Sequence, residues 1–353
     1  MIYDVAIIGL GPAGSILAKY LDKKMKVIAL DKKDTINSGF TKACGGMLAP
    51  DAQKAFSRFD MTLPKDILVD PQIFSVKTID LVNDLSAHYQ RHYVNMNRNK
   101  FDHWLISMIP SNVEVIRNSN CISVEKQNDV FHVVYSNQGE QQVIEARFVV
   151  GADGANSLVR RTFYPNFRIQ TYLSIQQWFK DQNPSPSYSC VFDHRITSSY
   201  VWGLTKDEFF IFGGAFHPKT GKEDFELIKQ KMKPYGFVLD HPLKTEACLV
   251  LRPSGPYNYC YGENGVFLIG EAAGFISPSS LEGISYAMNS AYILSECLNF
   301  PTRNPHRTYK AKTRSLRMKL FAKYIKFPFM YHPFLRKIVM NSGIASIKKI
   351  ARK

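Results

Sequence analysis

Three glycines near the start of the chain have the spacing of a phosphate-binding turn. Gly9, Gly11 and Gly14 follow an apolar run. Glycine at these positions lets the backbone turn sharply, approach a pyrophosphate and pack a helix against a strand. Asp31 follows about twenty positions later, where the ribose hydroxyls of a dinucleotide need an acceptor. The stretch therefore predicts a dinucleotide site and leaves both NAD(P) and FAD open.

The elements that must position this turn flank it on both sides. Residues 3–8 are typical of a buried strand, residues 16–21 of a helix, and residues 26–30 of a second strand that ends at Asp31. Pro12 and Ala13 stand in the first turn of the helix, whose N–H groups and positive dipole end would face the phosphates. A lone glycine motif also serves ordinary turns, so it is this context that favours a nucleotide site.

The composition limits the classes of protein to which this chain can belong. With 353 residues, 45% of them hydrophobic, the chain can bury a large core, and we expect two closely associated domains. No apolar run approaches the length that spans a bilayer, and the chain enters a strand at once without a signal peptide, so we expect a cytoplasmic protein. The cysteines are scattered and the histidines lack metal-ligand spacing. We therefore expect reduced thiols, no disulfide and no bound metal.

The excess positive charge is concentrated at the end of the chain. Residues 1–296 hold 30 Lys/Arg and 30 Asp/Glu, whereas residues 297–353 hold 15 Lys/Arg and no acidic residue. A charge run is usually a solvated face. Here the basic residues are mixed with large apolar ones, as in helices that lie on an anionic membrane, and we expect residues 305–353 to bind the inner face of the cytoplasmic membrane. Nucleic acid is the alternative partner, which we do not expect because the rest of the chain lacks a matching fold.

That basic segment is expected to form two helices from Pro305, separated by residues 327–333.

Two further glycine motifs occur far along the chain. Residues 151–157 (Gly-Ala-Asp-Gly-Ala-Asn-Ser) and 270–274 (Gly-Glu-Ala-Ala-Gly) each follow a strand-like run. Between them, aromatic strands alternate with turns, as in a mostly antiparallel domain inserted into a nucleotide-binding fold. We predict an α/β protein with a Rossmann-like domain in residues 1–161 and 261–300, an inserted β substrate domain in 162–260 and a basic helical tail in 301–353. Strands near residues 72–96 are further candidates for the substrate domain.

Together the three motifs resemble those of FAD enzymes with the p-hydroxybenzoate hydroxylase fold. The resemblance implies that the first motif binds the pyrophosphate of FAD and that the second, with Asp153 and Gly154, lies near the pyrophosphate and the approach of the nicotinamide. The third, with Gly270, would place Glu271 on the ribitol. Glu271 stands where that family usually has Asp, and its extra methylene still reaches a hydroxyl.

Other segments resemble the geranylgeranyl reductases, flavoenzymes that saturate isoprenoid double bonds. Residues 42–46, Lys-Ala-Cys-Gly-Gly, are similar to the cysteine–glycine loop of that family, and residues 98–102 to its arginine–Phe-Asp motif. Residues 200–206, Tyr-Val-Trp-Gly-Leu-Thr-Lys, are similar to its aromatic substrate-cavity motif, although a proline expected near Thr205 is missing. Residues 270–288 and 175–178 resemble one bacterial branch. This resemblance covers essentially the whole chain and implies further contacts with FAD: Lys42, Cys44, Gly45, Gly46, Arg98, Cys121, Gly283 and Ile284.

Several of these residues also have a structural interpretation. Cys44 could donate a proton or shape the loop beside the flavin, or it could be a small residue packed against glycines. Lys42 could neutralise a phosphate or stay solvated. Arg98 and Asp102 are four residues apart and could form an exposed ion pair on a helix; the resemblance instead makes Arg98 an FAD contact and Asp102 its structural partner.

The aromatic residues of the predicted substrate domain could line a tunnel for an apolar chain or fill an ordinary core. Tyr200, Trp202 and Leu204 alternate along one strand, so they would share a face. The full set is Trp178, Tyr188, Phe192, Tyr200, Trp202, Phe210 and Phe212.

These features predict an FAD-dependent reductase of carbon–carbon double bonds in an isoprenoid lipid, with Cys44, Tyr200 and Trp202 as its catalytic residues. A reductase of this kind delivers hydride from the flavin to one alkene carbon while a proton is added to the other, and the protein supplies position and acid. The same fold also suits an NAD(P)H- and oxygen-dependent flavin monooxygenase. A third alternative is a non-catalytic flavoprotein that sequesters a lipid.

Overall fold

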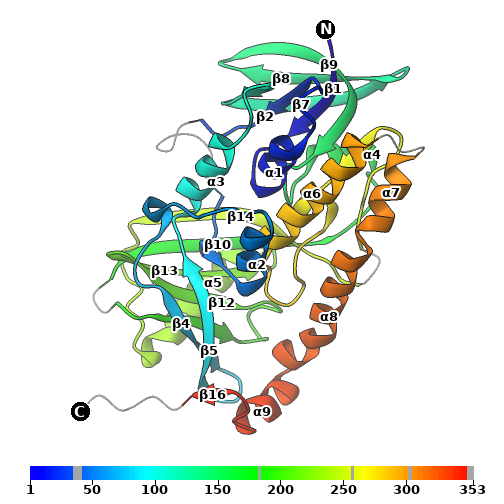
Figure 1. The fold of residues 1–353 in the computed structure, drawn as a ribbon. Coiled ribbons are helices and arrows are strands. Elements are labelled where there is room, and N and C mark those ends of the chain that lie inside the picture. Colours follow the sequence, from blue (N-terminus) through cyan, green and yellow to red (C-terminus); the bar gives the residue numbers. More distant parts are fainter. Residues whose placement is uncertain (35–41, 182–183, 256–257, 301–303, 348–353) are drawn as a thin grey trace. The chain divides into compact units, whose positions relative to one another are not determined.

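The computed structural model describes residues 1–34, 42–181, 184–255, 258–300 and 304–347. The chain divides into two compact units, each built from three separate segments (Figure 1). Unit 1 contains residues 1–41, 99–170 and 251–324, and unit 2 contains residues 42–98, 171–250 and 325–353. Residues 301–303 and 348–353 of the predicted basic tail lie outside the described residues.

Unit 1 is built on a sheet whose strands run in the order β6-β2-β1-β9-β8-β7, with β15 also paired to β9. Strands β6, β2, β1, β9 and β15 pair in parallel, and β8 and β7 continue the sheet antiparallel. Among the parallel strands, β2 and β15 are continuous apolar runs because both of their faces are buried. The strands are β1 (Ile2–Ile8), β2 (Val27–Leu30), β6 (Val113–Ile116), β7 (Ser119–Gln127), β8 (Val130–Asn137), β9 (Glu140–Gly151) and β15 (Val266–Leu268).

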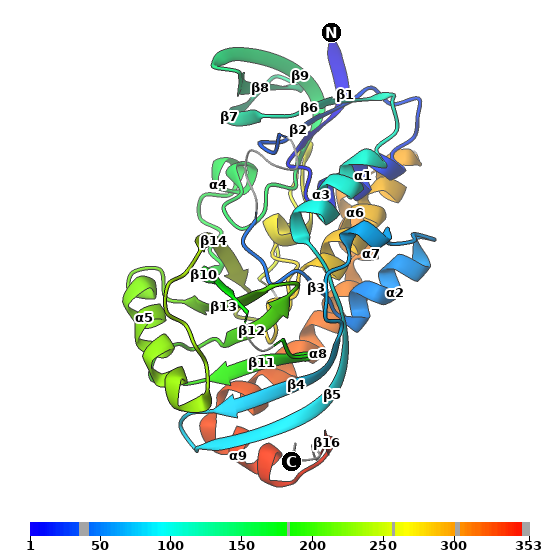
Figure 2. The same ribbon diagram turned by 90° about the vertical axis from the view of Figure 1, so that its left-hand side faces the viewer.

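Helices α1 and α6 pack side by side in unit 1 (Figures 1 and 2). Apolar residues of α1 such as Ile16 and Leu17 are fully buried, as are Met288 and Leu294 of α6. These two helices therefore position the ends of the strands that precede them. The helices of this unit are α1 (Pro12–Tyr20), α3 (Arg98–Ser107), α4 (Leu158–Phe163), η3 (Gly270–Ala273), α6 (Ile284–Asn299), α7 (Pro305–Lys312) and the larger part of α8 (Arg314–Tyr331).

Unit 2 is built on a second, mostly antiparallel sheet. Its strand order is β14-β10-β13-β12-β11-β4-β5-β16, with β3 paired to β5 and with β11 and β4 parallel. The strands are β3 (Met47–Leu48), β4 (Ile73–Asp80), β5 (Leu85–Asn95), β10 (Gln170–Lys180), β11 (Ser187–Phe192), β12 (Val201–Lys206), β13 (Phe209–Phe216), β14 (Lys244–Arg252) and β16 (Ser346–Ile347). The helices are α2 (Pro50–Arg58), η1 (Lys65–Ile67), α5 (Gly221–Met232), η2 (Lys233–Tyr235) and α9 (Pro333–Asn341).

Helix α5 covers one face of this second sheet (Figure 2). Its buried residues Phe225 and Ile228 form one core with Ile175, Val201 and Phe212 of the strands. Because successive residues of a strand point to opposite faces, the residues between these point away from α5. The sheet therefore presents its alternate residues, including Trp202, on the face opposite to α5.

The prediction of two helices separated by residues 327–333 is wrong. The tail forms α7, α8 and α9, and α8 continues through residues 327–331 with Pro328 inside it. Proline removes one helical hydrogen bond but its φ is compatible with a helix, and the rings of Phe327 and Tyr331 stack across it at 4.6 Å between centroids. The chain leaves the helical conformation at His332, because a residue that precedes proline disfavours it. Helix α9 then begins at Pro333.

Helix α9 is attached to β4 by a buried ion pair. The guanidinium of Arg336 donates from Nε to Asp80 Oδ2 at 2.7 Å and from Nη2 to Oδ1 at 2.9 Å. Burial alone would raise the pKa of Asp80, but the hydrogen bonds from Arg336 and Asn83 outweigh burial and lower that pKa. The pair therefore holds α9 at the carboxyl end of β4 in the second sheet.

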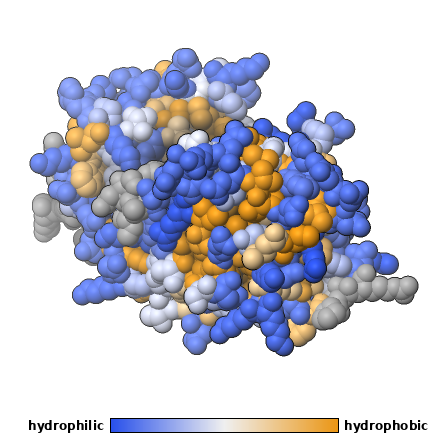
Figure 3. Space-filling model, turned by 90° about the horizontal axis from the view of Figure 1, so that it is seen from above, coloured by the Kyte–Doolittle hydropathy of each residue, from blue (hydrophilic) through white to orange (hydrophobic). Residues whose placement is uncertain are grey.

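No helix within the described ranges is both long and apolar enough to cross a bilayer. Apolar side chains nevertheless gather on part of the largely hydrophilic surface seen in Figure 3.

Arg336→Met is expected to lower the free energy of unfolding by about 3–5 kcal/mol, because it leaves the Asp80 carboxylate buried without its partner. Urea unfolding followed by circular dichroism measures the change. The exposed neighbour provides the matched control, since Lys337→Met should change stability by less than about 0.5 kcal/mol. Equal effects of the two substitutions would contradict a stabilising role for the ion pair.

Candidate functional site

The fold of unit 1 brings the three glycine motifs to one edge of its sheet. At the carboxyl end of β1, Ile8 pairs with Gly151 of β9, and Gly151 in turn pairs with Leu268 of β15. The first motif follows β1, the second follows β9 and the third follows β15. Ligands of open α/β sheets bind at the carboxyl ends of the strands. Segments more than a hundred residues apart in the sequence therefore meet where a nucleotide would bind.

The first turn depends on a close backbone approach. Gly9 has a φ of +98°, and a Cβ at Gly14 would lie 1.8 Å from the carbonyl oxygen of Gly9, so no side chain fits there. A Cβ at Gly11, in contrast, would meet nothing within 4 Å. Gly11 is the N-cap of α1 and no side chain caps it; Pro12 and Ala13 follow in the first turn. The N–H groups at the start of α1 are thus available to an anion.

Asp31, at the end of β2, holds this turn in place. Its buried carboxylate accepts hydrogen bonds from the backbone N–H of Leu10 and, at 2.7 Å, from the backbone N–H of Lys33. Lys33 Nζ lies 3.3 Å from Asp31 and 3.8 Å from Asp102 of α3. The structure thus gives Asp31 a structural task in addition to the predicted contact with ribose, which stays a prediction.

Asp153, in the second motif, caps a helix. Its Oδ2 accepts hydrogen bonds from the N–H groups of Leu158 at 2.6 Å and Val159 at 3.3 Å, at the start of α4. Its Oδ1 is buried and has no hydrogen-bond partner among the described residues. Burial raises the pKa of Asp153 despite these hydrogen bonds. An unpartnered oxygen in such a place can bond to a hydroxyl of a bound molecule.

Cys121 of β7 lies in the electrostatic field of that same carboxylate. Burial, with a smaller contribution from Asp153, raises the pKa of its thiol to about 12. The thiol is therefore protonated at neutral pH and is not a nucleophile. Its predicted contact with FAD stays a prediction.

The third motif lies directly against the second. Glu271, in η3, accepts a hydrogen bond through Oε1 from the backbone N–H of Leu251 at 3.0 Å, and its Oε2 lies 4.0 Å from the position that a Cβ at Gly154 would take. The N–H of Gly270 donates to Ser290 Oγ of α6 at 2.9 Å. The start of α6 completes the set, because Gly283 is its N-cap, without a side-chain cap, and Ile284 its first residue.

Unit 2 contains the predicted cysteine–glycine loop. The N–H of Gly46 donates to Cys44 Sγ at 3.4 Å, and a Cβ at Gly45 would lie 3.8 Å from Leu204 of β12. Lys42, at the start of the segment, is half-buried, and Arg98 is the first residue of α3. The loop and the strand of the aromatic motif therefore lie together in one unit.

Sequence reasoning gave no role to Lys206, the last residue of the aromatic motif, which connects the loop to the sheet. Its buried Nζ donates hydrogen bonds to Asn95 Oδ1 at 2.6 Å, to Met96 O at 2.6 Å and to Gly46 O at 3.0 Å. A Cβ at Gly46, whose φ is +60°, would lie 2.8 Å from the same Nζ. The alternation that includes Leu204 could have indicated Lys206, because it is the next residue on that face.

The aromatic residues divide between the two faces of the second sheet. Phe212 is part of the core under α5, and Phe210 packs against that core. Trp202 pairs with Gly213 on one side and Cys190 on the other, one residue out of step with the α5 core, so it points to the opposite face. By the same alternation, the residues on the face opposite to α5 are Trp178, Tyr188, Phe192, Tyr200, Trp202 and Leu204.

Two polar atoms on this aromatic face have no hydrogen-bond partner in the described parts of the chain. They are Nε1 of Trp202 and Oε1 of Gln176, both on side chains that are more than nine-tenths buried. The ring of Trp202 lies across Gly213, where a Cβ would be 2.7 Å from Nε1. The indole N–H can therefore donate to a polar group of a bound molecule.

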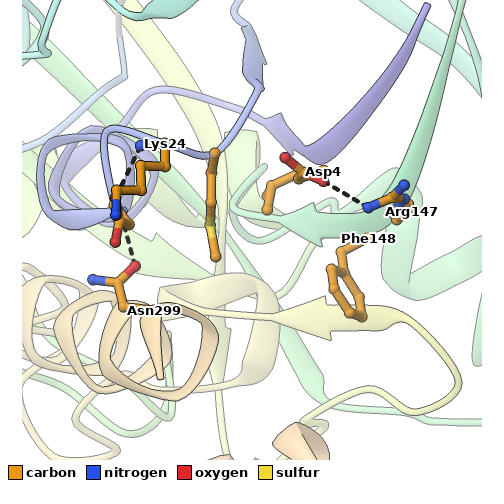
Figure 4. A pocket seen from close by; sticks show the side chains of 8 residues that line it. Asp4, Lys24, Arg147, Phe148 and Asn299 are labelled. Carbon is orange, nitrogen blue, oxygen red and sulfur yellow. Dashed lines mark hydrogen bonds and ion pairs between the residues drawn. The ribbon is translucent and has the colours of Figure 1, made fainter. Parts of the chain in front are cut away.

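A separate pocket of about 290 Å³ lies at the other end of the first sheet (Figure 4). Asp4, near the amino end of β1, points toward Arg147 and pairs with it at 3.1 Å, and Phe148, Lys24 and Asn299 also line the pocket. Because Gly9 follows the carboxyl end of β1, this pocket is not the predicted nucleotide site.

Comparison with known proteins identifies the relatives of this chain. Protein CbrA of Escherichia coli strain K12 is 50% identical over 349 residues, which are 99% of this chain and 99% of that protein. The chain belongs to the CbrA family. A family model described as lycopene cyclase protein matches residues 4–322. The resemblance of residues 270–288 and 175–178 to one bacterial branch is therefore confirmed, and that branch is the CbrA family.

Solved structures show the same fold. A geranylgeranyl bacteriochlorophyll reductase-like protein from Thermoplasma acidophilum superposes with a TM-score of 0.71 at 18% identity, covering 98% of this chain and 88% of that one. PqsL of Pseudomonas aeruginosa, "a probable FAD-dependent monooxygenase", gives a TM-score of 0.68 at 14% identity, covering 97% of this chain and all of that one. The predicted α/β fold of the p-hydroxybenzoate hydroxylase type, with a helical C-terminal region, is confirmed.

The site offers no ligand set for a metal in the part of the chain that the structure describes. All six cysteines are free thiols. Unit 1 offers instead a glycine turn, the starts of two helices and buried carboxylates. Unit 2, taken by itself, offers an aromatic sheet face.

The stability of the fold is expected to depend on the protonation of Lys206. Burial lowers the pKa of Lys206 to about 7, whereas the pKa of a lysine in the unfolded chain is about 10.4. Between these values the unfolded chain binds one more proton than the folded chain, so stability rises with pH across this window. Relative to Lys206→Met, the wild-type free energy of unfolding should rise by up to about 1.4 kcal/mol per pH unit.

Urea unfolding of both proteins at several pH values from 7 to 10 measures this slope. Lys337→Met, at an exposed position, is the control and should differ from wild type by the same amount at every pH. A pH-independent difference between wild type and Lys206→Met would show that the amino group does not titrate in this window.

Proposed function

We propose that this protein is an FAD-dependent oxidoreductase that reduces carbon–carbon double bonds of an isoprenoid lipid. The main observation that supports FAD as the cofactor is that three glycine motifs lie together at the carboxyl ends of β1, β9 and β15. The residues fit FAD in two respects. Space lies open at Gly11 beside the uncapped start of α1, and Asp153 Oδ1 is buried without a partner among the described residues.

In this proposal the pyrophosphate binds to the turn from Gly9 to Gly14 and to the start of α1. Asp31 accepts a hydrogen bond from a hydroxyl of the ribose, and Glu271 accepts one from a hydroxyl of the ribitol. The start of α6 directs backbone N–H groups at the ring system. Bound reduced FAD supplies hydride, which is chemistry that no side chain provides. The remaining contacts proposed from the resemblance are those of Lys42, Gly45, Gly46, Arg98 and Cys121.

The aromatic face of unit 2 supports an apolar substrate. Tyr200, Trp202 and Leu204 lie on the sheet face that α5 does not cover, and the Cys44 loop packs beside Leu204. In our proposal Tyr200 and Trp202 hold the alkene and exclude water, while the Cys44 thiol gives the proton that balances the hydride. The words lycopene cyclase and geranylgeranyl in the names of the related family model and fold both refer to isoprenoids, which supports that substrate class.

A monooxygenase is the second candidate, because PqsL shares the fold. A non-catalytic flavoprotein that retains a lipid is the third. We further propose that the protein acts on the cytoplasmic side of the membrane, where an isoprenoid lipid is available, and that it binds neither nucleic acid nor a metal.

The purified protein is expected to contain FAD, and Gly11→Ala should lower the FAD content at least about tenfold without unfolding the chain, because the methyl group occupies the space left for the pyrophosphate. Absorbance and mass spectrometry of the extracted cofactor measure this. Gly255→Ala is the control, because a Cβ at Gly255 also meets nothing within 4 Å but lies outside the three motifs. Equal FAD contents in the two variants would contradict the assigned site.

Anaerobic reaction of the dithionite-reduced protein with prenyl alcohols and prenyl phosphates is expected to yield products two mass units heavier, because hydride and proton add across one double bond. Trp202→Phe, which removes the indole N–H, should weaken substrate binding more than Trp178→Phe on the same face. A product sixteen units heavier, formed only with NADPH and oxygen, would identify a monooxygenase. Retained lipid without conversion under either condition would identify the non-catalytic alternative.

A further inference from the structure

Helix α9 is oriented against the usual rule for surface helices. Its buried residues are Arg336 and Met340, whereas Phe334 and Ile338 are 63% and 52% exposed. A surface helix normally buries its apolar stripe and exposes its charges. Here a buried ion pair to Asp80 attaches the helix, and the large apolar side chains point outward.

The same pattern occurs on either side of α9. At the end of α8, Ile325 and Phe329 are one helical turn apart and are 54% and 51% exposed. After α9, Ile344 is 75% exposed. We call Ile325, Phe329, Phe334, Ile338, Val339, Ile344 and Ile347 the C-terminal apolar residues; all of them are exposed and all belong to unit 2. Ile325 with Phe329 and Phe334 with Ile338 are each four residues apart on a helix, so each pair forms a local exposed apolar patch of the kind that marks an interaction surface.

The positive charge of the C-terminal segment indicates which kind of partner these apolar residues bind. Residues 297–353 carry 15 Lys/Arg and no Asp or Glu, and Lys326 and Lys337 lie exposed next to the C-terminal apolar residues. We propose that the C-terminal apolar residues bind the surface of an anionic lipid bilayer. The apolar side chains enter the boundary between headgroups and acyl chains, and the lysines contact the lipid phosphates.

Two other occupants fit these observations less well. In a two-fold contact between copies of the chain the same patch faces itself, so the lysines would repel one another with no acidic residue in the segment to compensate. A nucleic acid would pair with the lysines but would leave the exposed Phe and Ile side chains without apolar contacts. The described helices are too short or too polar to cross a bilayer, so the mode is attachment to its surface.

The anchoring ion pair explains how the fold tolerates this exposure. Arg336 also donates through Nη1 to the carbonyl of Met330 at 2.8 Å, so one side chain connects β4, the end of α8 and α9. Strand β16 pairs with β5 just beyond the helix. The C-terminal apolar residues are therefore held on a supported surface without being needed for the core.

Flotation of the full-length protein with vesicles tests the proposal. We expect wild type to bind vesicles that contain about one third phosphatidylglycerol and to bind phosphatidylcholine vesicles much more weakly. The double variant Phe334→Ser with Ile338→Ser should bind anionic vesicles at least about tenfold more weakly. Leu227→Ser is the matched control, because Leu227 is 50% exposed on α5, and it should bind like wild type.

Circular dichroism and FAD content of each variant verify the fold, so the test does not depend on catalytic activity. Failure of wild type to bind anionic vesicles would overturn the proposal, as would equal binding by the double variant. A wild-type dimer that the double variant converts to a monomer would assign the surface to a second copy of the chain. Binding to duplex DNA that matches vesicle binding in strength would also count against a lipid surface.

Discussion

The close approach of Gly14 to Gly9 is the constraint on which unit 1 depends. The carbonyl oxygen of Gly9 occupies the place where a Cβ at position 14 would be, so α1 can begin directly against the end of β1 only if that residue is glycine. This contact fixes the start of the helix at the edge of the sheet. Asp31 then secures the same turn from β2 through the N–H of Leu10. Backbone packing and the carboxylate together determine where an anion would be held.

Strand pairing extends this edge to the remaining motifs. Because β9 lies between β1 and β15, Gly151 is adjacent to Ile8 on one side and to Leu268 on the other. Glu271 and Gly154 approach each other for the same reason. The carboxylates of Asp153 and Glu271 both accept backbone N–H groups, so each helps to build the site it is proposed to serve. Structural and ligand-binding tasks therefore fall on the same residues.

Unit 2 uses one sheet for two purposes. The face toward α5 is a conventional apolar core around Phe212 and Val201, and the opposite face carries Trp202 and Leu204. Lys206 continues that second face and donates one hydrogen bond to Gly46 of the cysteine–glycine loop and two more to Asn95 and Met96. At the carboxyl end of β4, Arg336 takes the buried position in α9 that an apolar residue normally occupies. In both places a buried basic side chain organises nearby backbone.

The sequence by itself determined the features that depend on local spacing. The strand, glycine turn and helix at residues 3–21, the second strand ending at Asp31 and the alternation of Tyr200, Trp202 and Leu204 are set by neighbours in the chain. Only the tertiary structure decided which residues far apart would meet. Strand order and helix packing, which no local pattern specifies, determine the buried Arg336–Asp80 pair and the three acceptors of Lys206. They also determine which sheet face α5 covers, so that Phe212 lies in the core and Trp202 on the opposite face. The continuation of α8 through Pro328 was also missed, because proline forbids only one hydrogen bond and tertiary contacts decide whether a helix ends there.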